Sequence, residues 1–160
     1  MNDSGRVASR IVVGIDGSDQ SRQALSWALA EAHQRGIGCL LIHAVDFGLA
    51  AASPYAGSAF EQLREAGQVI LDDELARAAT TGVPVEGRLE VGSAAQALIA
   101  ASDDAALLIV GSRGHGGFAG MLLGSVSTAC VHHARCPIVV IPTPARPERA
   151  RVDEPRSTVT

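Results

Sequence analysis

The sequence contains no lysine, so all 13 of its basic side chains are arginines. This absence excludes the lysine of a Walker phosphate-binding loop and any Schiff-base chemistry on a lysine amine. Aromatic residues make up only 3% of the chain, and the formal net charge is -4. The chain therefore has neither the basic surface nor the stacking rings that nucleic-acid binding requires, and we expect no nucleic-acid partner.

Cysteines and long apolar runs are also scarce. The three cysteines, Cys39, Cys130 and Cys136, are too few and too odd in number for a disulfide framework. No apolar run reaches the length of a signal peptide core or a membrane span. We therefore expect a cytoplasmic protein with no membrane partner.

The residues that are present fit one compact domain. A chain of 160 residues with a hydrophobic fraction of 47% is long enough to bury a sizeable core. We expect residues 10–142 to form that domain, residues 1–9 to be a flexible arm, and the Pro- and Arg-containing residues 143–160 to be a disordered tail.

Short β-branched runs alternate along the chain with longer segments of helical period, which is typical of βα units around a parallel sheet. The predicted strands are residues 11–15, 39–45, 83–91, 106–110 and 138–141. Pro84 cannot donate to a strand ladder, so the third strand is expected near an edge. The fourth is a continuous apolar run and is expected to be buried on both faces. The fold class is α/β, an open, doubly wound five-stranded parallel sheet with helices on both faces.

Three serines stand where a helix N-cap is expected. These are Ser18, Ser58 and Ser93, and the last two have Glu61 and Gln96 three residues later, as in a capping box. The helix that Ser58 would open is long, and we expect its apolar side to face the sheet. That side comprises Leu63, Ala66, Ile70, Leu71, Leu75 and Ala78. A fourth helix is expected over residues 125–133.

The stretch GSRGHGGFAGMLLGSVS, residues 111–127, directly follows the buried fourth strand. Its six glycines let the backbone approach an oxyanion closely, and Arg113 supplies a cationic fork suited to phosphate. The helix that begins near residue 125 adds unpaired amides and the positive end of a dipole. Asp16 follows the first strand and is expected across the same crevice. The sequence thus predicts a phosphate site, and we expect Gly114 to adopt a positive φ there.

Each of these residues also fits a purely structural role. Ser125 is a suitable N-cap without any ligand, and Asp16-Gly17 is a common turn pair. Gly114, Gly116 and Ala119 match the loose G-x-G-x-x-[GA] fingerprint, but they follow the wrong strand and no acid lies about 20 residues later, so an NAD site is rejected. Near the C-terminus, the Cys and His residues between 130 and 136 do not have zinc-site spacing, and we expect no protein metal site there.

The spacing Gly111-x-x-Gly114, nine residues, then Gly124-Ser125 resembles the G-2x-G-9x-G-[ST] signature of the ATP-binding universal stress proteins. The stretches IVVGIDGS, LIHAVD and HHARCPIVVIP add to the resemblance, which covers residues 10–142. It implies a Rossmann-like sheet of the adenine-nucleotide alpha-hydrolase type.

The resemblance also implies a binding site for ATP with Mg²⁺. The implied site residues are Gly14, Ile15, Asp16, Ala44, Val45, Gly111, Arg113, Gly114, His115, Gly124, Ser125 and Val126. Within this set, the signature glycines and Ser125 would surround the phosphates, with Arg113, His115 and the Val126 amide beside them. Asp16 would meet the ribose or a phosphate-bound metal, Gly14 and Ile15 would line the floor, and Ala44 and Val45 would face the adenine. Members usually form homodimers through the last strand, here residues 138–141.

The implied function is that of a nucleotide-dependent regulatory protein in a stress response, not a dedicated catalyst, because no positioned base is visible in the sequence. Three alternatives stay open. The resident nucleotide is AMP or cyclic AMP, the protein is a weak ATPase or nucleotidyl transferase, or it is a protein-interaction module with an empty cleft.

Overall fold

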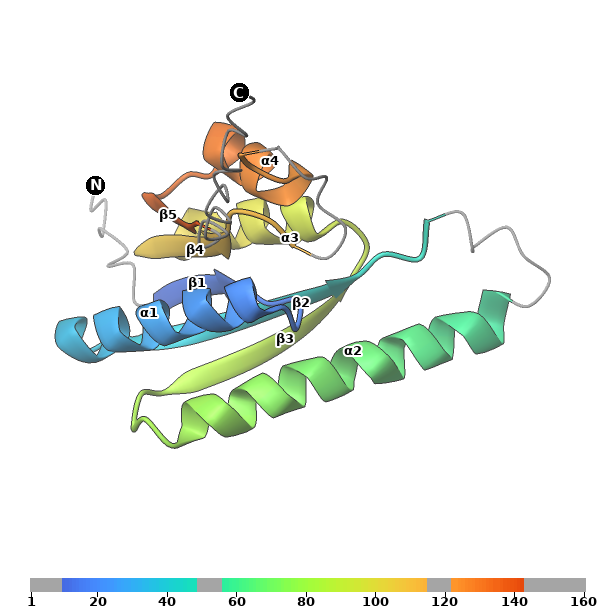
Figure 1. Cartoon of the computed structure of the whole chain (residues 1–160), viewed down its shortest axis with the longest axis horizontal. Helices are drawn as coiled ribbons and strands as arrows, with labels where there is room; N and C mark the ends of the chain where they lie inside the picture. Colours follow the sequence, from blue (N-terminus) through green and yellow to red (C-terminus); the bar gives the residue numbers. More distant parts are fainter. Residues whose placement is uncertain (1–9, 49–55, 115–121, 143–160) are drawn as a thin grey trace, which may run out of the picture.

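The computed structural model describes residues 10–48, 56–114 and 122–142, which form a parallel sheet between two layers of helices (Figure 1). The strands lie in the order β3-β2-β1-β4-β5. Their bounds are β1 Arg10–Gly14, β2 Gly38–Val45, β3 Val85–Val91, β4 Leu107–Gly111 and β5 Ile138–Ile141. The predicted five-stranded parallel α/β sheet is confirmed. From β1 the chain winds first to one side and then to the other.

The two strands that carry the predicted site, β1 and β4, are neighbours in the interior of the sheet. Residues 107–110 of β4 are all buried, as their continuous apolar run predicted. β3 is an edge strand, as predicted, and it begins only after Pro84. The carbonyl of Pro84 still accepts a hydrogen bond from the Cys39 amide at 2.9 Å, so the proline contributes an acceptor but no donor.

Helices cover both faces of the sheet, as expected. Their bounds are α1 Asp19–Arg35, α2 Ala56–Ala79, α3 Ala94–Ala101 and α4 Ser125–His133, with a short 3-10 helix, η2 Ser102–Asp104, after α3. Helices α1 and α2 pack on one face and α3 and α4 on the other (Figure 1). Because side chains alternate along a strand, Ile11 and Val13 of β1 enter the first apolar core and Val12 enters the second.

Two of the three predicted N-caps are confirmed. The Ser18 hydroxyl accepts from the Ser21 amide at 3.2 Å, and the Ser93 hydroxyl accepts from the Gln96 amide at 3.4 Å. The prediction for Ser58 is wrong, because α2 is already helical at Ala56. The same Ser-x-x-Glu pattern occurs inside helices, where the acid pairs with a later residue. Glu61 does so here, with Arg64 at 2.8 Å.

The predicted buried side of α2 is wrong in part. Ala66 is exposed, and Leu63 is 37% exposed. The residues that are buried lie on a line rotated from the predicted one, namely Gly67, Leu71, Glu74 and Ala78. Gly67 explains the rotation, because a Cβ atom at this position would lie 2.6 Å from Val45 Cγ1. The helix therefore approaches the sheet most closely along the glycine.

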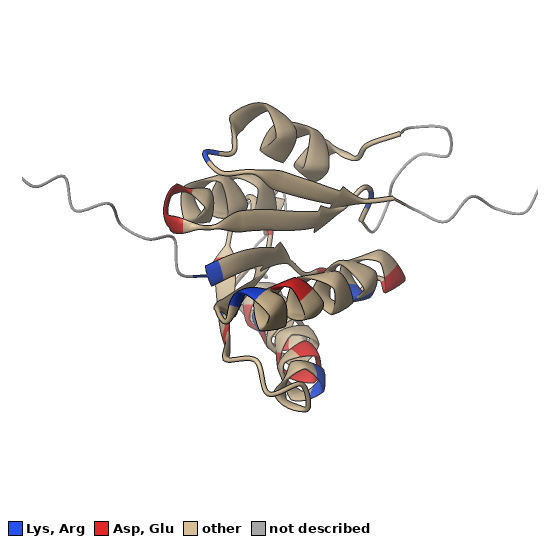
Figure 2. Cartoon of the chain, turned by 90° about the vertical axis from the view of Figure 1, so that its left-hand side faces the viewer, with Lys and Arg blue, Asp and Glu red and all other residues tan. Residues whose placement is uncertain are grey.

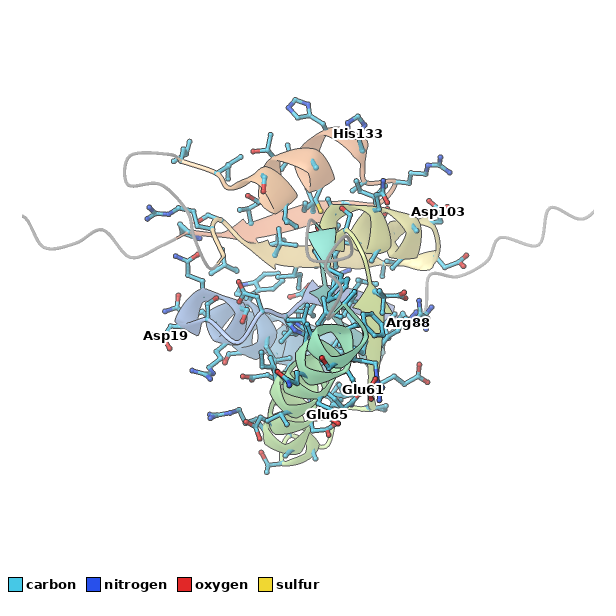
Figure 3. The ribbon with its side chains drawn as sticks, turned by 90° about the vertical axis from the view of Figure 1, so that its right-hand side faces the viewer. Asp19, Glu61, Glu65, Arg88, Asp103 and His133 are labelled. Atoms are coloured by element: carbon cyan, nitrogen blue, oxygen red, sulfur yellow. The ribbon has the colours of Figure 1, made fainter. Side chains whose placement is uncertain are left out.

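Charged residues gather on α1 and α2, whereas α4 and β5 carry no Asp, Glu or Arg (Figure 2). Figure 3 shows Glu61 and Glu65 on the outer side of α2 and His133 at the far end of α4. In residues 10–48, 56–114 and 122–142, no helix has both the length and the apolar character needed to cross a membrane.

Candidate functional site

A cleft of about 420 Å³ lies at the carboxyl ends of β1 and β4, where the winding direction of the sheet changes. This is the position at which open α/β sheets bind ligands. The volume is within the range of small-molecule sites. Residues from the β1–α1 turn, the end of β4 and the start of α4 form its walls, with one side closed by α3.

The β1–α1 turn places Asp16 at the mouth of the cleft. One carboxylate oxygen of Asp16 accepts from the Ser18 amide at 2.9 Å, which fixes the side chain over the start of α1. Gly17 makes the turn possible with a φ of 79°. The other carboxylate oxygen lies against Gly114, where a Cβ atom would come within 2.6 Å of it. Asp16 and the glycine-rich segment thus meet across the cleft, as the sequence predicted.

The expected positive φ at Gly114 is wrong, because its φ lies outside the left-handed region. The absent side chain at this position instead leaves room for the Asp16 carboxylate. A close approach between segments distant in sequence leaves no local signal in the sequence. Sequence reasoning therefore selected Gly114 correctly but explained its presence wrongly, by a positive φ.

The carbonyl of Ser112, directly after β4, is joined to the start of α4 by two hydrogen bonds. The Ser112 carbonyl accepts from the Gly124 amide at 2.7 Å and from the Ser127 hydroxyl at 2.8 Å. The Arg113 amide donates to Gln20 Oε1 at 3.0 Å, which joins this segment to α1. These bonds hold the start of α4 beside Arg113 at the edge of the cleft.

Within the described ranges, no side chain caps the start of α4. Gly124 is the N-cap residue, and Ser125 is the first helical residue, so Ser125 is not the cap that a purely structural reading gives it. The first turn of any α-helix leaves amide groups without partners inside the helix. Here those of residues 125–127 lie beside the cleft, with the positive end of the helix dipole. This arrangement suits an anion.

His43 supports the floor of the cleft from the neighbouring strand. It is buried at the end of β2, and its Nδ1 lies 2.7 Å from the Ile15 carbonyl. A carbonyl can only accept, so Nδ1 carries the hydrogen and donates it. The Ile15 amide donates to the Ile42 carbonyl at 2.9 Å. The ends of β1 and β2 are therefore joined directly below the site.

Most of the predicted site residues come together in this cleft. Those that line it are Gly14, Ile15, Asp16, Ala44, Gly111, Arg113, Gly114, Gly124, Ser125 and Val126. Val45 does not line it. Adjacent residues of a strand point to opposite faces, and the Val45 side chain lies under α2, against Gly67. His115 lies outside the described residues.

Sequence reasoning missed several residues that line the cleft. They are Ser21, Ile42, Ala94, Leu98, Val110 and Ser127. Ala94 and Leu98 stand four residues apart on α3, so one face of that helix closes the cleft, and their spacing is the only signal that the sequence offered. Which part of the molecule this helix face covers depends on tertiary packing, and a local residue pattern does not encode it.

The sequence profile of the Universal stress protein family matches residues 8–142. This chain belongs to that family. A universal stress protein of Mycolicibacterium smegmatis is 37% identical over 134 residues, which are 82% of this chain and 45% of the relative. The chain spans about half the length of the curated relatives it matches.

Solved structures of the family share the fold. A family member from Burkholderia pseudomallei is 30% identical with a TM-score of 0.65, and the match covers 85% of this chain and 97% of that one. A universal stress protein in complex with cAMP is 27% identical with a TM-score of 0.61, over 83% and 95% of the two chains. A protein from Archaeoglobus fulgidus in complex with dAMP is 22% identical with a TM-score of 0.61, over 82% and 96%.

Proposed function

We propose that this universal stress protein binds ATP with Mg²⁺ in the cleft between β1 and β4 and acts as a regulatory protein. Nucleotide occupancy would then alter its conformation or its choice of partner. The observation that carries the proposal is the glycine-capped start of α4, which faces Asp16 across the cleft beside Arg113.

The phosphate groups have a chemically suitable place at this helix start. Gly124 brings no side chain, so a phosphate oxygen can reach the amides of residues 125–127. The Arg113 guanidinium adds a charge that is always present and a planar set of donors. The complete G-2x-G-9x-G-[ST] spacing runs through the same residues and supports a polyphosphate there.

Mg²⁺ fits the donor set when phosphate is present. The cation prefers oxygen ligands and is usually held by one or two carboxylates together with substrate phosphates. Asp16 supplies one carboxylate, which already stands opposite the start of α4. Among the described residues, no group of three or more His, Cys, Asp or Glu side chains is placed to hold a metal ion. We therefore propose that the ion enters with the nucleotide.

The inner part of the cleft suits the adenine ring. Ile42, Ala44 and Leu98 give it apolar walls, and the first and last of them are almost fully buried. A flat aromatic ring that is enclosed by such side chains is removed from water, which is favourable. The base and the phosphates would thus occupy opposite ends of one cleft.

AMP or cyclic AMP is the second candidate, and the 27% identical neighbour in complex with cAMP favours it. A single phosphate group could bind to Arg113 and the start of α4 as readily as a triphosphate could. Titration calorimetry with ATP, AMP and cyclic AMP, each with and without Mg²⁺, separates the candidates. We expect ATP with Mg²⁺ to bind most tightly. Cyclic AMP binding tenfold more tightly than ATP would replace it as the ligand.

The alternative of a weak ATPase is tested by phosphate release. Among the described residues that line the cleft, Asp16 is the only one with an acidic or imidazole side chain, and in the proposed complex it binds Mg²⁺. A carboxylate bound to Mg²⁺ is a poor general base. We therefore propose a regulatory role without dedicated catalysis. Rapid turnover that Asp16→Ala abolishes while ATP still binds would instead show an enzyme.

We also propose that the protein works in the cytoplasm as a homodimer paired through β5. Residues 138–141 are four apolar residues at an edge of the sheet, and all are partly exposed. An exposed apolar edge strand readily pairs with a second chain.

A further inference from the structure

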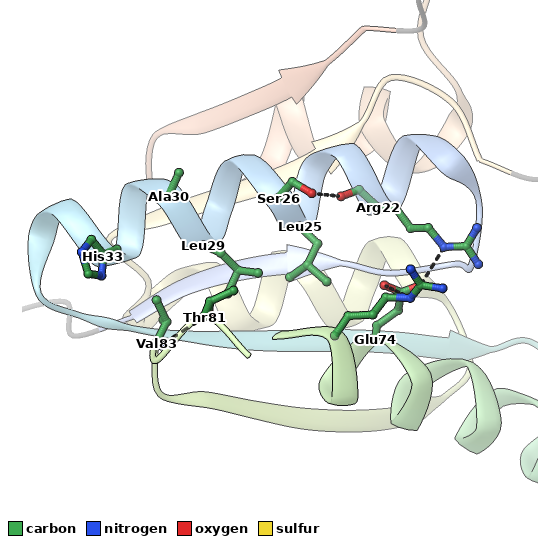
Figure 4. A pocket seen from close by; sticks show the side chains of 10 residues that line it. Arg22, Leu25, Ser26, Leu29, Ala30, His33, Glu74, Thr81 and Val83 are labelled. Atoms are coloured by element: carbon green, nitrogen blue, oxygen red, sulfur yellow. Dashed lines mark hydrogen bonds and ion pairs between the residues drawn. The ribbon is translucent and has the colours of Figure 1, made fainter. Parts of the chain in front are cut away.

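A second hollow lies between α1 and α2, on the face of the sheet that these helices cover (Figure 4). We call it the α1/α2 groove. It has a volume of about 560 Å³, and it shares no lining residue with the cleft. Leu25, Leu29 and Val83 line its apolar part, and each is less than a tenth exposed. Ala30 lines it from an exposed position on α1.

Glu74 brings a buried carboxylate to one end of the α1/α2 groove. Its side chain is 2% exposed, and its Oε1 accepts from Arg22 Nε at 2.9 Å (Figure 4). Its Oε2 is buried and has no hydrogen-bond partner in the described part of the chain. A buried carboxylate oxygen without a donor is costly, and few native groups are left in this state.

Arg77 covers Oε2 without satisfying it. The Arg77 Nε lies 3.9 Å from Oε2, which is close enough for an ion pair but too far for a hydrogen bond. The Arg77 side chain is 63% exposed, so it can swing toward water at little cost. A donor that enters the groove can then reach the oxygen.

The charges around Glu74 select a neutral molecule. Arg22 and Arg77 are balanced by Glu74 and by Asp19, whose carboxylate lies 3.3 Å from Arg22. A cation or an anion would upset this balance, and the apolar lining would not solvate either. We propose that the α1/α2 groove binds a neutral, mainly apolar small molecule that donates one N–H or O–H hydrogen bond to Glu74 Oε2. The site is independent of the proposed nucleotide site.

Two probes of the same shape test the donor. Indole carries one N–H donor, and benzofuran has an oxygen at the same place. Both are titrated into the full chain while the methyl NMR signals of Leu25, Leu29 and Val83 are followed. For a ligand of this size we expect indole to bind with a Kd of about 10 mM or lower. Benzofuran should bind at least about fivefold more weakly. Equal affinities, or no change in these signals, would overturn the proposal.

Three variants locate the hydrogen bond and the site. In Glu74→Gln the amide oxygen can keep the Arg22 contact, and the NH₂ group then replaces Oε2, so the preference for indole over benzofuran should vanish. Arg77→Ala removes the cover and should bind indole at least as tightly as the natural protein. A large loss in Arg77→Ala would contradict the proposed role of Oε2. Glu65→Gln, on the outer side of α2, is the matched control and should change nothing.

A blocking variant keeps the proposal testable if Glu74→Gln fails to fold. Ala30→Phe adds a ring from an exposed helix position, so the core is not disturbed. It should weaken both probes by about fivefold or more, because it occupies groove volume. Unchanged binding in a folded Ala30→Phe protein would show that the probes bind elsewhere. ATP affinity, measured in the same variants, should not change.

Discussion

At the scale of single residues, Gly114 and Asp16 approach each other closely across the cleft. A Cβ atom at residue 114 would lie 2.6 Å from the Asp16 carboxylate, which must then move away from its present position. We expect Gly114→Ala to weaken Mg-ATP binding by about 1 to 3 kcal/mol, or roughly fivefold to 150-fold. Calorimetry measures this change. Gly57→Ala, where nothing lies within 4 Å of the added atom, is the control. Natural affinity in a folded Gly114→Ala protein would refute this account of the contact.

The buried thiols predict how stability depends on alkaline pH. Burial raises the pKa of Cys39 and of Cys130 to about 11, from 9.0. Because the folded-state pKa is the higher one, the stabilisation is complete below pH 9 and is lost as the pH rises toward 11. We expect the free energy of unfolding to fall over this window by up to about 3 kcal/mol per thiol.

Urea unfolding at several pH values between 8.5 and 11 measures this loss. The double variant Cys39→Ala/Cys130→Ala is less stable overall because it leaves two small cavities, but its stability should fall less steeply over the same window. An equally steep fall in this variant would assign the alkaline transition to other groups.

At the scale of elements, Gly67 sets the distance between α2 and the sheet. Its absent side chain leaves room for Val45, and an added Cβ atom would also lie 3.1 Å from atoms of His43 and Leu89. Alanine favours helix more than glycine does, yet we expect Gly67→Ala to destabilise the fold by about 1 to 3 kcal/mol through overpacking. Gly57→Ala in the same helix should be neutral or slightly stabilising. Thermal unfolding of the Gly67→Ala and Gly57→Ala variants measures the difference in stability. Equal stability of the two variants would contradict the role of Gly67 in setting the distance between α2 and the sheet.

Local patterns predicted most elements of this fold. The strand over residues 138–141 and the helix over residues 125–133 have the predicted bounds. Pro137 stands directly before the strand, and Gly124 is the N-cap of the helix, so both segments begin sharply. The interior position of β4 was also predicted from its local pattern, because a continuous apolar run is favourable only in a strand that is buried on both faces.

Non-local contacts set what the sequence did not predict. The buried side of α2 includes Gly67 and leaves Leu63 exposed, although Leu63 has the more apolar side chain. The close approach of the helix backbone to the sheet at Gly67 outweighed the hydrophobic pattern. The site prediction included both Ala44 and Val45, although the side chains of these neighbours point to opposite faces of the sheet and only Ala44 lines the cleft. Alternation was therefore a usable signal. In contrast, the role of Leu98 depends on where α3 packs.

At the scale of the whole molecule, β5 carries the proposed dimer contact. The carbonyls of Pro137 and Ile141 accept hydrogen bonds from the amides of Leu108 and Ser112. The backbone amide and carbonyl groups of the odd-numbered residues therefore point toward β4. By alternation, the amide of Val140 points toward the open edge. Val140→Pro therefore removes an outward donor and leaves the ladder to β4 intact. We expect it to shift the protein to monomers in light scattering coupled to size-exclusion chromatography. A Val140→Pro dimer as stable as the natural one would exclude pairing through this edge.

The central claim is that the start of α4 and Asp16 hold the phosphates of a nucleotide between them. The crystal structure of the protein with Mg-ATP tests it most directly. We predict triphosphate oxygens within hydrogen-bond distance of the amides of residues 125–127, and Mg²⁺ between these oxygens and the Asp16 carboxylate. Triphosphate bound at any other place on the molecule, the α1/α2 groove included, would contradict the claim.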